Sequence, residues 1–154
     1  MASDLSSFGD QVVLVVGAAS GIGRAAAHLI ASRGGTVVIA DLDEVGLASL
    51  QKELGLADKQ VKSVNMGDQS SIHALITSVV SDYGQIDALI NSAGVVGPTN
   101  TKVEDVEWPA FERTVTINLF GTVWITQAIL PHMKARKYGR IAHIASIAGK
   151  EGNP

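Results

Sequence analysis

Near its start the chain passes from a run of five apolar residues straight into a stretch rich in glycine. The run is Val12-Val13-Leu14-Val15-Val16, and the stretch is Gly17-Ala18-Ala19-Ser20-Gly21-Ile22-Gly23. A strand without polar alternation is buried on both faces, as strands of parallel sheets are. Apolar residues at helical spacing follow, so the sequence predicts a strand, a tight turn and a helix. Such an opening favours a sheet with helices on both faces.

The same alternation continues along the whole chain. Strands are predicted at residues 12–16, 36–40, 61–64, 86–90 and 140–145. Helical patterns separate all of them, so the strands should be parallel and joined by right-handed crossovers. The fold class is therefore α/β. We expect a Rossmann-like, doubly wound parallel sheet with five strands in the order 3-2-1-4-5 and helices on both faces, one strand short of the usual six.

The first three helical patterns have clear faces or clear ends. Asp43 and Asp68 stand where helix N-caps are expected, and Gly55 and Gly84 stand where the same two helices should end. The first helix is expected to use an apolar stripe formed by Ile22, Ala26, Leu29 and Ile30.

The fourth helical pattern is long, covering residues 108–137. The β-branched cluster at 114–117 and Gly121 predict a break or bend near Asn118. Apolar residues surround much of the second half of this pattern, namely Phe120, Trp124, Ile125, Ile129 and Met133. They are expected to be buried, either within the chain or against a second copy.

Composition excludes several classes of protein. With 46% hydrophobic and 18% charged residues the chain is not disordered, and a net charge of −3 argues against a nucleic-acid partner. There is no cysteine, hence no disulfide, no cysteine-based zinc site and no thiol nucleophile. The apolar run at 12–19 is too short for a membrane span, and Asp4 stands where a signal peptide would be basic, so we expect a cytoplasmic protein without a membrane partner. No metal-ligand spacing relates the four histidines, which are His28, His73, His132 and His143.

The glycine stretch has a chemical interpretation because of its place between a strand and a helix. Glycine lets the backbone approach a diphosphate without a Cβ in the way. The start of a helix adds unpaired N–H groups and the positive end of the helix dipole. The pattern therefore favours a dinucleotide site, and the alternative is a plain strand-to-helix turn.

Asp41 ends the second predicted strand, 18 residues after Gly23. An acid at this distance can accept hydrogen bonds from the hydroxyls of an adenosine ribose and would repel a 2′-phosphate. Ser20 supplies no compensating positive charge. Both observations favour NAD over NADP, while the alternative is that Asp41 caps the loop or the next helix.

These motifs, taken in order, resemble the short-chain dehydrogenase/reductase family. The resemblance rests on Gly17-x-x-x-Gly21-x-Gly23, on Asn91-Ser92-Ala93-Gly94, on Asn118 within a helix and on Ile144-Ala145-Ser146-Ile147-Ala148-Gly149. It covers the chain from about residue 11 to its end. The tail from Gly149 looks most like 3-oxoacyl-acyl-carrier-protein reductases.

The resemblance implies a cofactor role for several positions. The loop around the diphosphate would consist of Gly17, Ser20, Gly21, Ile22 and Gly23, and Asp41 would select NAD. Asn91, Ala93 and Gly94 match an element that supports the sheet and the cofactor. Asn65, with Met66 beside it, lies where the family usually has an aspartate facing adenine, and its amide oxygen could accept the same hydrogen bond.

The resemblance also implies catalytic roles. Ser146 matches the serine that bonds the substrate oxygen, and Asn118 matches an asparagine of the proton relay. The family further needs a tyrosine followed four residues later by a lysine. Tyr83 and Tyr138 are the two tyrosines of the chain, and Asp87 and Ala142 stand four residues after them.

Without that pair, residues 1–154 are expected to form a dinucleotide-binding Rossmann domain that stops before the Tyr-x-x-x-Lys helix and the sixth strand. The complete enzyme would transfer a hydride between NAD(H) and a small alcohol or carbonyl substrate and would form a dimer or tetramer. The chain alone should be inactive, and its fifth strand should be an uncovered apolar edge. The alternatives are a non-catalytic NAD(H)-binding module or natural short form and, with less support, a methyltransferase.

Overall fold

Five parallel strands form one sheet, in the order β3-β2-β1-β4-β5. The structure is a computed structural model that describes residues 7–151. The strands are β1 (Val12–Val16), β2 (Thr36–Asp41), β3 (Val61–Ser63), β4 (Ala88–Asn91) and β5 (Arg140–His143). The number, direction and order of the strands confirm the prediction of an α/β, Rossmann-like sheet.

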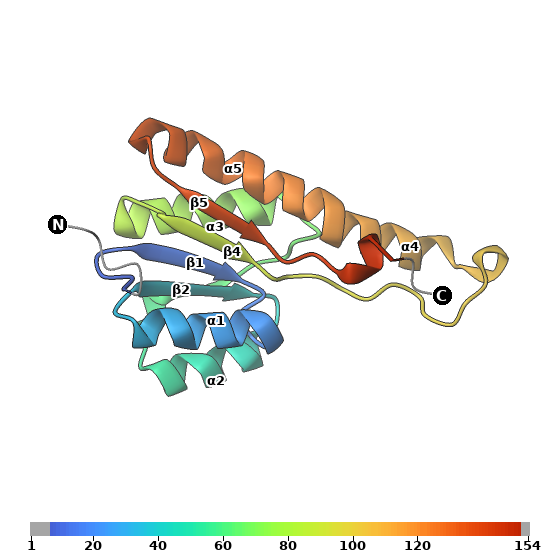
Figure 1. The fold of residues 1–154 in the computed structure, drawn as a ribbon, viewed down its shortest axis with the longest axis horizontal. Helices are drawn as coiled ribbons and strands as arrows, with labels where there is room; N and C mark the ends of the chain where they lie inside the picture. Colours follow the sequence, from blue (N-terminus) through green and yellow to red (C-terminus); the bar gives the residue numbers. More distant parts are fainter. Residues whose placement is uncertain (1–6, 152–154) are drawn as a thin grey trace.

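Helices cover both faces of this sheet (Figure 1). On one face lie α1 (Gly21–Ser32) and α2 (Glu44–Leu54), and on the other lie α3 (Gln69–Tyr83) and α5 (Gly121–Arg136). The remaining helix, α4 (Trp108–Val115), continues the line of α5 past the carboxyl ends of the strands (Figure 1). The loop from β4 to α4 therefore also projects beyond that edge.

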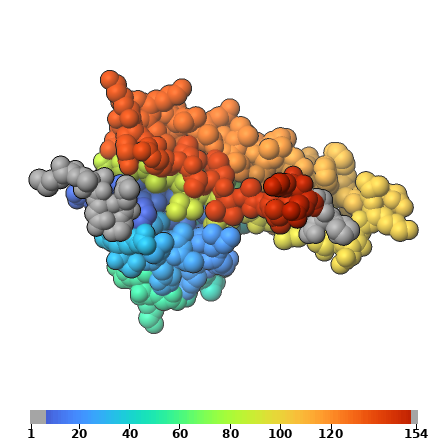
Figure 2. All heavy atoms as spheres, viewed as in Figure 1, coloured from blue at the N-terminus to red at the C-terminus, as the bar shows by residue number. Residues whose placement is uncertain are grey.

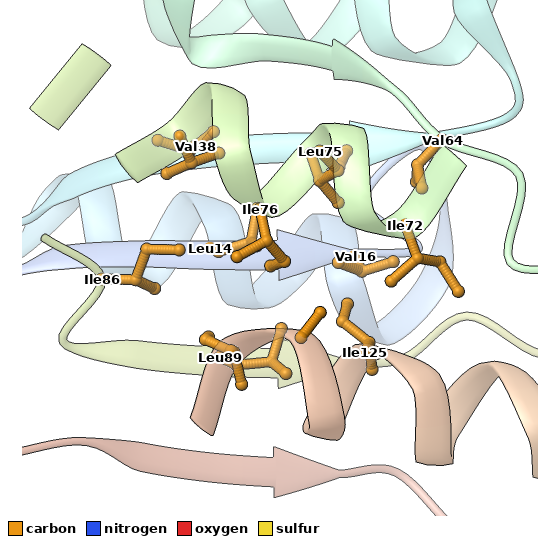
Figure 3. Packing of buried hydrophobic residues seen from close by; sticks show 14 of the residues in the cluster. Leu14, Val16, Val38, Val64, Ile72, Leu75, Ile76, Ile86, Leu89 and Ile125 are labelled. Atoms are coloured by element: carbon orange, nitrogen blue, oxygen red, sulfur yellow. The ribbon is translucent and has the colours of Figure 1, made fainter. Parts of the chain in front are cut away.

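The core consists of two apolar layers, one on each side of β1. Leu14 and Val16 point toward α3 and α5, while Val13 and Val15 point toward α1 and α2, and all four are fully buried. Figure 3 shows the first layer, where Leu14 and Ile76 of α3 lie close together. Full burial of one such aliphatic side chain stabilises a fold by about 1.5–3 kcal/mol, so the continuous apolar run at 12–16 gives β1 its central place.

The predicted apolar stripe of α1 is wrong in part. Ile30 is buried, but Ile22 is 61% exposed and Leu29 is 47% exposed. The residues that α1 buries besides Ile30 are Gly23 and Ala27. Small residues let the helix lie close to the strands, which turns the larger Ile22 outward at the start of the helix. The sequence pattern could not reveal this, because helical spacing does not say which stripe faces the sheet.

The helix ends agree with the sequence prediction. The side chain of Asp43 accepts a hydrogen bond from the N–H of Gly46, and that of Asp68 accepts one from the N–H of Ser70. The pKa of the Asp68 carboxyl is lowered, mainly by its hydrogen bonds from the side chain and backbone of Ser70. Gly55 and Gly84 end α2 and α3 in left-handed backbone conformations, which glycine adopts readily.

The irregularity expected near Asn118 is a π-helical turn at Thr116–Phe120 that joins α4 to α5. The helical direction continues across it (Figure 1), so the predicted irregularity is a change of winding and not a break. Gly121 follows, and a Cβ there would lie 2.5 Å from the carbonyl oxygen of Met66. The turn and the glycine together let the helix lie against the backbone that follows β3.

Three strands are shorter than predicted, and the first of them, β3, ends at Ser63, one residue early. β4 begins at Ala88 because the residue before it, Asp87, uses its side chain as a clamp and is 4% exposed. β5 ends at His143, and three of its four residues are exposed. In the space-filling view, β5 and the residues after it, coloured red, lie uncovered on the face toward the viewer (Figure 2). The edge is uncovered as expected, but it is not the expected apolar edge, because its exposed residues are Arg140, Ala142 and His143.

Within residues 7–151, no helix has the length and apolar character needed to cross a membrane. The described residues also contain no cluster of histidine, aspartate and glutamate side chains suited to hold a metal ion.

Candidate functional site

A cavity of about 460 Å³ opens at the carboxyl ends of the strands. In doubly wound sheets ligands bind at this edge, where the strand order reverses between β1 and β4. The residues lining the cavity come from the ends of β1 to β4, the start of α1 and the end of α4, and they are Val16, Gly17, Ser20, Gly21, Ile22, Asp41, Leu42, Val64, Asn65, Met66, Ser92, Ala93, Gly94, Val95, Arg113 and Ile117. Nine residues selected from the sequence as cofactor-binding are among them.

At each of the three glycine positions in the loop after β1, the structure requires glycine for a different reason. A Cβ on Gly17 would lie 2.5 Å from the nitrogen of Ala93, so this glycine allows the loops after β1 and β4 to touch. A Cβ on Gly23 would overlap the carbonyl oxygen of Gly17 and the hydroxyl of Ser92. Gly21 has φ +53° and open space within 4 Å of its Cβ position, so it faces the cavity and not another segment.

Backbone N–H groups at the start of α1 are available to a ligand. The N–H groups of Gly17 and Ala18 donate to the carbonyl of Ala40. Those of Gly21 and Ile22, the first residues of the helix, donate to no acceptor in the described part of the chain. Unpaired N–H groups at a helix start, with the positive end of its dipole, attract an anion. The open space beside Gly21 adjoins these N–H groups.

Asp41 has a structural role that the sequence left as an alternative. Its Oδ2 accepts the N–H of Ala19 at 2.9 Å, and its Oδ1 accepts the N–H groups of Leu42 at 2.7 Å and Asp43 at 3.0 Å. The carboxylate thus fixes the glycine loop and the turn after β2. A carboxylate has about four acceptor positions, so capacity remains for a hydroxyl in the cavity that Asp41 lines.

The arginine of α1 is engaged beside the same loop. Arg24 donates to the carbonyls of Ala19 and Gly46 and to the side chains of Ser49 and Glu53. The pKa of Glu53 is lowered, first by the hydrogen bond from Ser49 and also by the charge of Arg24. The guanidinium is therefore paired with Glu53, and no ion pair among the described residues involves Asp41.

At the other side of the cavity, Asn65 and Met66 follow β3 and meet the end of α4. The Oδ1 of Asn65 accepts the N–H of Gly67 at 2.9 Å, so this oxygen keeps one further acceptor position. Sequence reasoning missed Arg113 and Ile117, which line the same region. Their spacing of four residues puts them on one helix face, and Ile117 precedes Asn118, so helical periodicity could have indicated them.

Asn91 and Asn118 lie outside the cavity lining and bind the backbone of the loop after β4. Asn118 donates through Nδ2 to the carbonyl of Val95 at 2.8 Å and accepts the N–H of Val95 through Oδ1 at 2.9 Å. Asn91 is 3% exposed and accepts the N–H of Ala93. Both asparagines therefore fix the loop after β4, and neither lines the cavity, nor does Gly23.

Ser146 lies after β5, where it caps a short helical turn. Its hydroxyl oxygen accepts the N–H of Ala148 at 3.2 Å, and the residue is outside the cavity lining. Tyr83 ends α3, where burial and then the charge of Asp82 raise its pKa, and Tyr138 precedes β5. Neither tyrosine lines the cavity.

The family model of the short chain dehydrogenases matches residues 11–154, which is nearly the whole chain. The chain belongs to this family. That membership agrees with the strand order, the glycine loop and the cavity at the carboxyl edge, and it confirms the resemblance inferred from the sequence motifs. Members of the short-chain dehydrogenase family are oxidoreductases that bind nicotinamide cofactors.

Individual relatives share about a third of their residues with the chain. The 3-oxoacyl-[acyl-carrier-protein] reductase FabG of Thermotoga maritima is 37% identical over 147 residues, which cover 94% of this chain and 58% of that protein. NAD⁺-bound xylitol dehydrogenase is 32% identical with a TM-score of 0.84, covering 96% of this chain and 57% of that chain. Actinorhodin polyketide ketoreductase with NADPH is also 32% identical, with a TM-score of 0.85, covering 93% and 56%. The chain thus spans somewhat more than half the length of these short-chain dehydrogenase relatives.

Proposed function

We propose that the chain is the cofactor-binding part of an NAD(H)-dependent oxidoreductase that acts on a small alcohol or carbonyl substrate. The bound dinucleotide would accept or give the hydride. The observation that carries the proposal is the glycine loop, where unpaired N–H groups of Gly21 and Ile22 border the open space beside Gly21. Gly17 and Gly23 hold this loop against the segment after β4, so the anion site is built before the ligand arrives.

Asp41 supports the choice of NAD over NADP. Its carboxylate lines the cavity and keeps one acceptor position for a ribose hydroxyl. A 2′-phosphate at the same place would meet a like charge, and Arg24 is occupied by Glu53 and by two carbonyls. Xylitol dehydrogenase and the polyketide ketoreductase carry different dinucleotides, so the proposal rests on the residues of this chain.

We propose that Ser146 holds the substrate oxygen in the complete active site and that Asn118 shapes the loop beside it. The proton donor would be a tyrosine activated by a lysine. Tyr83 and Tyr138 are not suited to this role, because neither is followed by lysine at the fourth position and neither lines the cavity. We therefore propose that residues 1–154 by themselves bind the cofactor and do not turn over substrate. We also propose that the protein is cytoplasmic.

A second candidate function is a non-catalytic NAD(H)-binding module. It is favoured by one specific observation: the glycine loop is complete, while both tyrosines lie away from the cavity. The two candidates differ in turnover and not in binding. Oxidation of a panel of small alcohols by the full chain with NAD⁺, at rates ordinary for dehydrogenases, would exclude the module and would also contradict the proposed inactivity.

The proposed function is tested by calorimetric titration of the full chain with three ligands. We expect NAD⁺ to bind, NADP⁺ to bind more weakly and S-adenosylmethionine not to bind. Tighter binding of NADP⁺ would overturn the role given to Asp41. Selective binding of S-adenosylmethionine would instead support a methyltransferase, and no binding of any of the three to the folded protein would refute the proposal.

We also propose that the protein forms a homo-oligomer, a dimer or tetramer, through the π-helical turn at Thr116–Phe120 and α5. An apolar stripe runs along this helical line on the side away from the core. Its members are exposed by about a third to more than half of their surface, and they are Leu119, Phe120, Val123 and Leu130. Exposed apolar stripes of this kind mark contacts between proteins.

A further inference from the structure

His143 is the last residue of β5, and although the residue is exposed, its ring contacts side chains of both β4 and α5. The Nδ1 atom lies 3.4 Å from the Nδ2 of Asn91, and the Nε2 atom lies 3.0 Å from the hydroxyl of Thr126. None of the roles given above to the cavity residues uses this ring. The atoms around it determine which of its nitrogens carries a proton.

The hydroxyl of Thr126 determines the state of Nε2. This hydroxyl lies 2.7 Å from the carbonyl of Thr122, which can only accept, so the single hydroxyl proton of Thr126 is used there. Thr126 must then accept from the histidine. The ring nitrogen Nε2 therefore carries a hydrogen.

The side chain of Asn91 determines the state of Nδ1. The N–H of Ala93 can only donate, so the atom of Asn91 that faces it is the amide oxygen. The Asn91 nitrogen then points at the Thr122 hydroxyl at 3.3 Å and at the histidine Nδ1. The Thr122 hydroxyl donates its own proton to the carbonyl of Asn118 at 2.8 Å. Both hydrogens of the buried Asn91 amide thus need acceptors, and a deprotonated Nδ1 is one of them.

This arrangement favours the neutral ring. A proton on Nδ1 would face the NH₂ group of Asn91, so that two donors would meet. Burial also lowers the pKa of His143 below its ordinary value of 6.5, which acts in the same direction. The side chains of β4 and α5 that contact the ring are Asn91 and Thr126, neither of which is charged.

Charged groups of the same elements lie at the opposite end of the strands. Asp87 precedes β4, and its carboxylate pairs with Arg136 in the last turn of α5. Arg140 begins β5, with its side chain on the carbonyl of Gly139 and against the ring of Tyr138. The length of β4 or β5 separates these groups from His143.

Through Asn91 the ring reaches the cavity. Asn91 holds the N–H of Ala93, and Ala93 lines the cavity and touches the loop after β1 at Gly17. We propose that His143 is a positioning residue, which in its neutral Nε2–H form fixes Asn91 and through it the Ala93 segment, so that protonation of the ring weakens dinucleotide binding. This inference rests on the proposed function for its ligand, but its structural half concerns the protein alone.

The experiment joins nuclear magnetic resonance of the ¹⁵N-labelled full chain with calorimetry. Without ligand, the ring should give the Nε2–H tautomer at neutral pH, and the Ala93 amide should shift together with the ring as the pH falls below about 6.5. In His143→Asn, whose amide oxygen can still accept from Asn91 and does not titrate, the Ala93 amide should stay constant. His73→Asn, at an exposed position on α3, should retain the behaviour of the unmodified protein.

Calorimetry with NAD⁺ supplies the second readout. Affinity should fall about three- to tenfold between pH 8 and pH 5, the range that the loss of one hydrogen bond gives, and should vary much less in His143→Asn. Any one of three results would overturn the inference. They are an Nδ1–H tautomer, an Ala93 amide resonance that does not change as the ring titrates, and an equal loss of NAD⁺ affinity at low pH in both proteins. If NAD⁺ does not bind at any pH, the proposed function fails, while the tautomer and the Ala93 shift still decide the role of His143.

Discussion

Gly21 is the residue on which most of the proposed chemistry depends. Its backbone is left-handed, and its missing Cβ leaves room beside the first unpaired N–H groups of α1. Gly55, at the end of α2, has nearly the same backbone, with φ +63° and open space at its Cβ position. The two glycines therefore carry similar backbone demands, and of the two only Gly21 lines the cavity.

We predict that Gly21→Ala lowers NAD⁺ affinity at least about tenfold, because its methyl group would enter the space of the diphosphate. Both Gly21→Ala and Gly55→Ala should destabilise the fold by about 1–2 kcal/mol, the cost of a left-handed backbone for a residue with a Cβ. Calorimetry and thermal unfolding on both variants check this. Equal affinities in the two variants would contradict the assigned role.

Asp41→Asn tests cofactor choice at the level of a single charge. The asparagine oxygen can still accept the N–H groups of Leu42 and Asp43, while the bond from Ala19 is lost for both dinucleotides alike and the repulsion of a 2′-phosphate disappears. We predict that the ratio of NADP⁺ to NAD⁺ affinity rises about tenfold, which corresponds to about 1.4 kcal/mol. Titrations of both dinucleotides give the ratio, and an unchanged ratio would mean that Asp41 serves the loop alone.

At the residue scale the sequence indicated more about chemistry than about contacts. The order of the motifs and the spacing of 18 residues from Gly23 indicated that Asp41 faces the cofactor, and Asp41 does line the cavity. The sequence did not reveal that Asp41 binds three N–H groups of its own loop, because such bonds depend on how the turn is wound. The sequence also did not indicate the contacts of the His143 ring, since its partners Asn91 and Thr126 come from other elements.

Among the elements, β1, β4 and α5 are joined by one buried carboxylate. Asp87 accepts the N–H of Val12 at 2.8 Å and the side chain of Gln85 at 2.9 Å, and it pairs with Arg136 at 2.8 Å. Because the carboxylate is nearly inaccessible, removing it leaves donors from three segments without their acceptor.

We predict that Asp87→Ala destabilises the protein by about 2–3 kcal/mol, the cost of leaving a buried N–H and a charged partner unsatisfied. The control is Asp82→Ala, which removes the exposed partner of Lys62 and should cost less than about 1 kcal/mol. Denaturant unfolding measures both. Similar losses of unfolding free energy in the two variants would contradict the proposed role of the buried Asp87 carboxylate in joining the three elements.

Sequence reasoning was most accurate for the helices and strands and their ends. Cap residues such as Asp43 and Asp68, and end glycines such as Gly55 and Gly84, are local signals, and the structure uses all four as predicted. The stripe through Ile22 was wrong because the face that a helix buries depends on the sheet beneath it. Local signals thus give boundaries, and tertiary packing gives orientation.

For the molecule as a whole, strand order followed from chain order. Alternating strands and helices with right-handed crossovers leave few arrangements, and the observed order 3-2-1-4-5 is the one predicted. Of the two faces left open, the edge at β5 was predicted from the sequence, and the outward direction of the apolar stripe was not. This stripe runs along the π-helical turn and α5.

That outer stripe carries a prediction about assembly. Val123→Glu, in the middle of the stripe, should lower the mass of the protein in solution from that of a dimer or tetramer to a smaller species. Val45→Glu, on α2, is the matched control, because Val45 is 82% exposed and away from the stripe. Light scattering after size-exclusion chromatography checks both. The same mass for all three proteins would contradict assembly through this face.

The central claim is that the start of α1 holds the diphosphate of a dinucleotide. The most direct measurement follows the ¹⁵N–¹H resonances of Gly21 and Ile22 as NAD⁺ is added to the full chain. The account predicts that these two amides shift more than those of Gly55 and saturate at the same concentration that calorimetry gives for binding. Saturable binding of NAD⁺ that leaves both amides unmoved would contradict it.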